Sequence, residues 1–266
     1  MAPGEGSSGP AFRMPTFRLA PGRTLVGVSV RADSAAKVGA LWDHLMRGGV
    51  GVQGSMLNAC PEGFEALAIL DLTEVGREVG LELLRGTPLK GVEVEVIDSG
   101  IEGFASIGGH VLESGGHRSV IFSRNTVLGF LRGMRELMGE AAGAAFLYHA
   151  GFVSGREWGR YLAGRARDAR EALAINLEVM KSHGLATSVA VLEGEGRYRF
   201  EARDLFECDL LSGYAAERGG RLRTSHWFRG ALAGFLSEVM GGEWDVEEVE
   251  CVNDGSDRCA FEARRK

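Results

Sequence analysis

Residues 24–100 alternate between short apolar runs and amphipathic stretches, and this pattern predicts a compact βαββαβ unit. Ser34 can cap the first helix, in which four apolar residues recur on one face: Val38, Leu41, Trp42 and Leu45. We expect strands at 24–30, 50–57, 64–72 and 91–96 and helices at 35–47 and 73–84, the second capped by Thr73. This order of elements is that of a ferredoxin-like α+β fold.

The pattern changes to helical spacing from Asn125 onward. Apolar residues recur there every three or four positions, beginning with Leu128, Leu131 and Met134. Further helices are expected at 141–166, 168–183 and 227–240, and strands at 188–192, 198–202, 245–251 and 258–263. Between the two halves, a Gly115-Gly116 turn flanked by strands at 105–113 and 119–123 predicts a linking hairpin.

The chain therefore divides into four segments. Residues 1–23 contain Gly, Ser and Pro with little periodicity, which predicts a flexible leader. The βαββαβ unit occupies 24–100, the linking hairpin 101–124, and a second domain of mixed α+β type 125–266.

The composition argues against several classes of protein. The net charge is −6 and the basic residues are scattered, so no electrostatic footprint for direct nucleic-acid binding is visible. We expect no membrane span and no secretory signal, and four cysteines in a chain of this length do not make a disulfide framework. These features predict a cytoplasmic protein. The chain has 40 glycines, and those that lie inside periodic apolar segments favour close helix packing and tight turns.

The strongest chemical signal lies near the C-terminus. Cys251 and Cys259 bracket a tight turn, so their thiolates can face one metal across a β-hairpin. His226 and Glu248 could complete the four ligands that Zn²⁺ prefers, with Cys208 in reserve. In a regular strand Glu248 and Cys251 point to opposite faces, so both can bind only if a bulge intervenes. The alternatives are a buried pair of free cysteines or a disulfide, and a core thiol at Cys208.

One helical segment could line a pocket for a flat ligand. Gly151, Gly155 and Gly159 recur at intervals of four, which indicates close packing of two helices or room for a ligand. The candidate ligand contacts are Phe146, His149, Phe152, Trp158 and Tyr161. We expect a mostly apolar cavity between this helix and the sheet that carries residues 198–200, with His149 or Trp158 donating the orienting hydrogen bond.

The N-terminal unit resembles an ACT domain, a small regulatory fold that often binds amino acids. The resemblance rests on residues 27–33, Gly39-Ala40-Leu41 and residues 48–52. Val38 stands where the family usually has Pro, and the spacing from Asp33 to Gly39 is longer than usual. These departures fall where ACT domains bind their ligand, so the resemblance implies the fold and not amino-acid binding.

Residues 126–264 resemble the 4-vinyl reductase domain family. Three blocks carry this resemblance, namely residues 148–155, 226–234 and 248–261. His226 stands where the family has a Cys. The family includes sensory domains of aromatic-responsive transcriptional activators and archaeal proteins described as predicted hydrocarbon binders. The resemblance implies a zinc site and, because relatives dimerise, a homodimer.

These observations predict a two-domain sensor or regulatory protein with a structural zinc and a small hydrophobic or aromatic ligand. No catalytic triad, paired-carboxylate motif or nucleotide loop stands out, so we do not expect an enzyme. The alternatives are an enzyme or enzyme accessory in tetrapyrrole or aromatic reduction, and a protein-interaction scaffold related to vesicle-tethering subunits.

Overall fold

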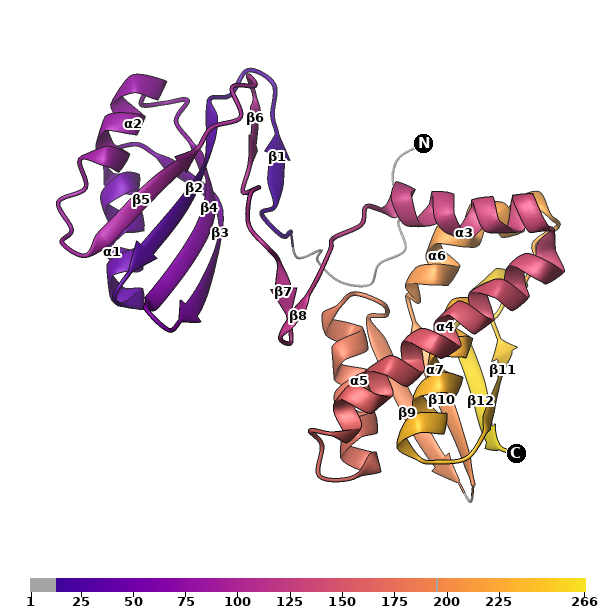
Figure 1. Cartoon of the computed structure of the whole chain (residues 1–266). Coiled ribbons are helices and arrows are strands. Elements are labelled where there is room, and N and C mark those ends of the chain that lie inside the picture. Colours follow the sequence, from indigo (N-terminus) through magenta and orange to yellow (C-terminus); the bar gives the residue numbers. More distant parts are fainter. Residues whose placement is uncertain (1–12, 195) are drawn as a thin grey trace. The chain divides into compact units, whose positions relative to one another are not determined.

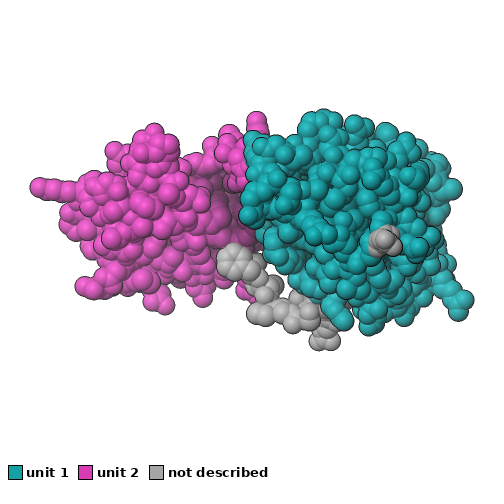
Figure 2. Space-filling view, turned by 90° about the horizontal axis from the view of Figure 1, so that it is seen from below, with its two compact units in different colours: residues 1–8, 121–266 teal, residues 9–120 magenta. Residues whose placement is uncertain are grey.

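The computed structural model describes residues 13–194 and 196–266, which divide into two compact units (Figure 1). Of the described residues, 13–120 form the N-terminal unit and Ile121–Lys266 the C-terminal unit, which Figure 2 shows in different colours. The division falls inside the segment 101–124, where the sequence predicts a linking hairpin.

The N-terminal unit follows the predicted order of elements. It contains β2 (Leu25–Ala32), α1 (Ala35–Arg47), β3 (Gly51–Cys60), β4 (Gly63–Asp71), α2 (Arg77–Arg85) and β5 (Val92–Ile97). The sheet order is β3-β4-β2-β5 and every pairing is antiparallel. This is the arrangement of a ferredoxin-like unit, while the narrower resemblance to an ACT domain stays a prediction.

Side chains along β2 alternate between the two faces of this sheet, and both faces are packed. Val26, Val28 and Val30 are buried in the core that α1 and α2 cover. On the opposite face Leu25 packs with residues that include Ala105. Gly27 is needed there because a Cβ at this position would lie 2.1 Å from the carbonyl oxygen of Ser106.

Three local predictions need correction. Within the predicted leader, β1 (Phe17–Leu19) is a strand that pairs with β6 (Phe104–Ser106), while residues 1–12 lie outside the described residues. The first predicted strand of the linking hairpin begins in β6, which pairs with β1 instead of with the second strand. The hairpin itself is therefore shorter than predicted and consists of β7 (Glu113–Ser114) and β8 (His117–Arg118) around the glycine turn. Thr73 does not cap α2, because its hydroxyl bonds to Asp71 (2.5 Å) and helix α2 begins four residues later.

The C-terminal unit places helices against a second antiparallel sheet. Its helices are α3 (Arg124–Met138), α4 (Glu140–Ala163), α5 (Ala169–Ser182), α6 (Phe206–Glu217) and α7 (His226–Val239). Its strands are β9 (Ser188–Gly194), β10 (Arg197–Arg203), β11 (Trp244–Glu250) and β12 (Cys259–Arg265), in the order β11-β12-β10-β9. The core lies between this sheet and the helices α5 and α7.

Helix α6 was not predicted from the sequence. Its N-cap, Leu205, supplies no capping side chain, so the usual start signal is missing. Its buried face includes the charged Glu207, and its exposed face includes Gly213 and Ala216. The contrast between apolar and polar faces that reveals a helix is therefore weak in this segment.

Helices α4 and α7 touch backbone to backbone. A Cβ added at Gly155 would lie 2.0 Å from the carbonyl oxygen of Ala231, and one at Gly151 would lie 2.1 Å from that of Trp227. The contact is reciprocal, since a Cβ at Gly230 would lie 2.0 Å from the carbonyl oxygen of Tyr148. The glycine run of α4 therefore serves close helix packing. In the described part of the chain, no helix has both the length and the apolar character to cross a bilayer.

Candidate metal centre and apolar cavity

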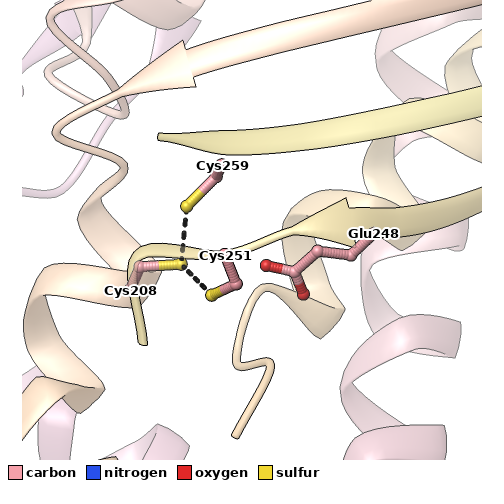
Figure 3. A group of neighbouring side chains, drawn as sticks. All are labelled: Cys208, Glu248, Cys251 and Cys259. Atoms are coloured by element: carbon pink, nitrogen blue, oxygen red, sulfur yellow. Dashed lines mark hydrogen bonds between the residues drawn. The ribbon is translucent and has the colours of Figure 1, made fainter. Parts of the chain in front are cut away.

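Four potential metal ligands converge in the C-terminal unit (Figure 3). Cys208 comes from α6, Glu248 from β11, Cys251 from the residue after β11, and Cys259 from the start of β12. All four residues are buried, and their ligand atoms lie within 4.8 Å of one another. The Sγ atom of Cys208 is 3.6 Å from that of Cys251 and 3.3 Å from that of Cys259.

A β-bulge allows Glu248 and Cys251 to reach the same point. The register of β11 against β12 shifts between Glu248 and Glu250. The extra residue reverses the alternation of side chains along the strand, so the carboxylate and the thiol fall on one side. This is the bulge that the sequence requires if both residues are ligands.

The hairpin turn fixes the position of the two cysteines that flank it. Cys251 caps a short 3-10 turn, Val252–Asp254, and the Asp254 carboxylate accepts a hydrogen bond from the backbone N–H of Cys251 (3.4 Å). Gly255 then takes a φ of 102°, a left-handed conformation that glycine adopts without strain. The chain can therefore turn back into β12 with Cys259 facing Cys208.

Polar neighbours hold the candidate ligands in place. The Ser225 hydroxyl donates to a carboxylate oxygen of Glu248 (2.8 Å), and the Thr224 hydroxyl lies 3.4 Å from the Cys208 sulfur. Asn253 donates through Nδ2 to both the Thr224 hydroxyl and the Cys208 carbonyl oxygen, each at 2.9 Å. Such outer partners orient ligands in metal sites.

The protonation of this cluster is shifted by burial and by mutual contact. Burial, together with the nearby Cys251 thiol, raises the pKa of Glu248 to about 8. Hydrogen-bond contacts with Cys208 and Cys251 lower the pKa of Cys259 to about 4, while contacts with Cys251 and Cys259 raise the pKa of Cys208. Four acidic groups this close cannot all ionise without a cation among them.

The donor set fits a zinc ion. Soft thiolates select Zn²⁺ over hard cations, and structural zinc sites use four protein ligands. Tetrahedral zinc with Zn–S bonds of about 2.3 Å separates its sulfurs by roughly 3.8 Å, which is close to the spacings of 3.3 and 3.6 Å found here.

His226 is not part of this cluster, so Cys208 stands where the sequence suggested the histidine. His226 is the first residue of α7, and its buried Nδ1 atom has no hydrogen-bond partner within residues 13–194 and 196–266. Burial, together with the charges of Arg135 and Arg229, lowers its pKa to about 4. Sequence reasoning retained Cys208 as a reserve ligand but missed α6, the helix that brings it to the hairpin.

A cavity of about 240 Å³ lies among α4, α5 and α7. This differs from the predicted position between α4 and the sheet, where Phe200 is fully buried in the core. The cavity is lined by Ser154, Gly155, Trp158, Asn176, Val179, Met180, His183, Leu185, Trp227, Ala231 and Phe235. The wall is mostly apolar, as in typical small-molecule sites.

Of the expected ligand contacts, Trp158 lines this cavity and the other four do not. Phe146 and His149 lie on the exposed side of α4. Phe152 packs against the main core. Tyr161 stacks against the ring of Trp158 with ring centres 5.1 Å apart, so it supports a wall residue without lining the cavity itself.

One buried polar side chain lies in the apolar wall. The Trp158 indole N–H donates to Asn176 Oδ1 at 3.0 Å. Asn176 is 2% exposed, and its Nδ2 atom has no hydrogen-bond partner in the described residues. Sequence reasoning missed Asn176, because an amide on an otherwise apolar helix face is indistinguishable from a partly exposed position.

The C-terminal unit is thus an α+β domain in which one helix and one hairpin assemble a metal-type cluster beside a helix-lined cavity. Residues 224–265 match the model of the 4-vinyl reductase domain, which confirms the predicted resemblance to this family over that stretch. No curated protein matches the chain.

Three solved structures resemble this chain to different degrees, and the first of them has a similar fold. The phenol-responsive sensory domain of the transcription activator PoxR, determined with phenol, matches with a TM-score of 0.50 and 18% identity over 57% of this chain and 78% of that one. A vinyl-4-reductase family protein from Methanocaldococcus jannaschii matches at a TM-score of 0.35, with 22% identity over 56% of this chain and 83% of that one. Subunit 3 of a trafficking protein particle complex from Naegleria fowleri, bound covalently to palmitic acid, matches at a TM-score of 0.41, with 16% identity over 54% and 95% of the two chains.

Proposed function

We propose that this protein is a sensor whose C-terminal unit binds a small hydrophobic or aromatic molecule and holds a structural zinc ion. The observation that carries the proposal is the apolar cavity of about 240 Å³, one wall of which is α7, the helix that directly follows Ser225, a hydrogen-bond partner of Glu248. The match to the 4-vinyl reductase domain and the fold shared with a phenol-responsive sensory domain support a role in ligand sensing.

In this proposal Cys208, Glu248, Cys251 and Cys259 hold the zinc ion. A site closed by four protein ligands leaves no open position for substrate, so zinc would supply cross-linking and not catalysis. The ion would join α6 to the β11–β12 hairpin, two segments that are far apart in the sequence. A binding role in place of an enzymatic one, and a cytoplasmic location, belong to the same proposal.

Helix α7 gives a physical connection between cluster and cavity. Ser225, directly before α7, bonds to the Glu248 carboxylate, and the neighbouring Glu207 carboxylate accepts the backbone N–H groups of Trp227 (3.1 Å) and Phe228 (3.0 Å). Trp227 also lines the cavity, as do two residues further along the helix. A ligand that favours one position of α7 would therefore shift the population of states that a partner can recognise.

We propose that the chain acts as a homodimer. Large apolar side chains are exposed on α3 and α4, namely Phe130, Leu137, Met138, Phe146 and Val153. Contacts between two copies would bury this surface, and two-fold dimers are the commonest soluble oligomers. Sedimentation of the full chain at micromolar concentration should give the mass of a dimer, and a monomer would contradict this part of the proposal.

Binding can be tested by calorimetric titration of the full chain with phenol. Val179→Phe would fill the cavity, whereas Val79→Phe places the same side chain on an exposed position of α2 in the N-terminal unit. We expect saturable binding of one phenol per chain, at least tenfold weaker binding by V179F, and unchanged binding by V79F. Equal binding by both variants would place the ligand outside the cavity and overturn the proposed site.

A further inference from the structure

Asn176 is a buried polar side chain in the mostly apolar wall of the cavity. It lines the cavity, it is 2% exposed, and its Nδ2 atom has no partner in the described residues. The other polar lining residues, Ser154 and His183, are exposed to solvent. A buried donor without a partner is rare in folded proteins, because the group loses its hydrogen bonds to water and gains none.

The orientation of this amide is fixed by its neighbour. An indole N–H can only donate a hydrogen bond, so the atom that faces Trp158 Nε1 at 3.0 Å must be the amide oxygen. The amide nitrogen is then the atom left without a protein partner, and both of its N–H groups are donors. Because Asn176 lines the cavity, this unpartnered donor lies in a mostly apolar wall.

We infer that the cavity selects ring compounds that carry a hydrogen-bond acceptor, such as an aryl ketone or aldehyde, and that Asn176 is the residue that recognises the acceptor. This inference rests on the proposed function, since it names the class of ligand for the same cavity. The carbonyl oxygen would accept from Nδ2, while the ring would contact the apolar wall formed by side chains such as Met180 and Phe235.

The volume of the cavity and the charges of its lining residues narrow the class of ligand further. An engineered cavity of about 150 Å³ binds benzene, so a volume of about 240 Å³ accommodates one substituted ring or two fused rings. A ligand ammonium group would meet donors from Asn176 and no buried carboxylate in the lining, which excludes cationic amines. A neutral acceptor on a flat apolar body satisfies the wall and the amide together.

The test compares acetophenone with ethylbenzene, which have nearly the same shape and differ in the carbonyl oxygen. Ethylbenzene is the more hydrophobic of the two, so burial of apolar surface alone would favour it. We expect the full-length protein to bind acetophenone about tenfold more tightly in calorimetric titrations, the effect of one good hydrogen bond.

Asn176→Leu keeps the approximate volume and removes the donor, so acetophenone should lose its advantage and ethylbenzene should bind at least as well. Asn58→Leu makes the same substitution at an exposed position of β3 and should change neither affinity. Affinities of the wild-type protein within twofold of each other would overturn the inference while leaving the proposed function in place. Failure of the wild-type protein to bind either compound or phenol would overturn the proposed function as well.

Discussion

The two units cover a four-stranded antiparallel sheet in different ways. In the N-terminal unit, aliphatic side chains fill the space between sheet and helices, and the buried carboxylate of Asp71 has hydrogen-bond partners on Thr73 and Arg23. In the C-terminal unit, helices touch at glycines, four acidic ligands crowd together, and the buried side chains of Asn176 and His226 leave polar atoms unpaired within the described residues.

This difference fits the proposal that the C-terminal unit gains stability from what it binds, whereas the N-terminal unit has fewer unpaired buried atoms among the described residues. Unpaired buried groups and crowded thiols destabilise a fold unless a ligand or a metal satisfies them. Most of these groups among the described residues lie in the C-terminal unit, of which residues 224–265 match the 4-vinyl reductase domain. Our proposal therefore places binding in that unit, and the following predictions challenge it from the largest expected effect to the smallest.

Removal of a metal ligand should have the largest effect. Cys251→Ser should lower the free energy of unfolding of the C-terminal unit by about 3 kcal/mol or more, because metal binding energy at a structural site is folding energy. Calorimetric unfolding should show this loss in one transition only, and a strong chelator should reproduce it in the wild-type protein. Cys60→Ser, in the N-terminal unit, is the matched control and should leave both transitions unchanged. If both variants shifted the unfolding transitions equally, the two units would not differ in their dependence on a metal.

Close packing of α4 on α7 should give the next largest effect. In Gly155→Ala the new methyl group would meet the Ala231 carbonyl oxygen at 2.0 Å, so the helices must separate at a cost of about 1–3 kcal/mol. Gly133→Ala in α3 meets no atom within 4 Å and should stabilise that helix by about 0.5–1 kcal/mol. Chemical denaturation of both variants checks the opposite signs, and a neutral G155A would show that the backbone contact is absent.

The smallest predicted effect is the pH dependence of the folding stability of the N-terminal unit. Burial alone would raise the pKa of Asp71, but hydrogen bonds from Thr73 and Arg23 outweigh it and lower the pKa in the folded state. The carboxylate therefore stabilises the fold above its unfolded pKa of about 4, and this stabilisation is lost as the pH falls below that value. Asp71→Asn should cost about 1 kcal/mol at pH 7 and progressively less in acid. If the wild-type protein and Asp71→Asn differed in unfolding free energy by the same amount at pH 7 and at pH 3, Asp71 would not be charged in the folded state.

Sequence reasoning succeeded where local signals decide the structure. The helix Ala35–Arg47 has its predicted bounds because its apolar spacing and the turn that follows are local. Sequence reasoning failed where contacts between segments far apart in the chain decide the structure. Nothing near Cys208 shows that it meets Cys251, and the Glu207 that precedes it makes α6 look less like a buried helix. Likewise, the glycines of α4 predict a close neighbour without naming α7, and the cavity of about 240 Å³ lies among α4, α5 and α7 instead of between α4 and the sheet.

The most direct test of the account is the zinc content of the purified full chain and of two variants, measured by native mass spectrometry. We predict one zinc per chain in the wild-type protein, loss of the ion in Cys208→Ser, and retention in His226→Ala, because Cys208 and not His226 lies with Glu248, Cys251 and Cys259. Well under one equivalent in the wild-type protein, or loss of zinc in the His226 variant with retention in the Cys208 variant, would contradict the account.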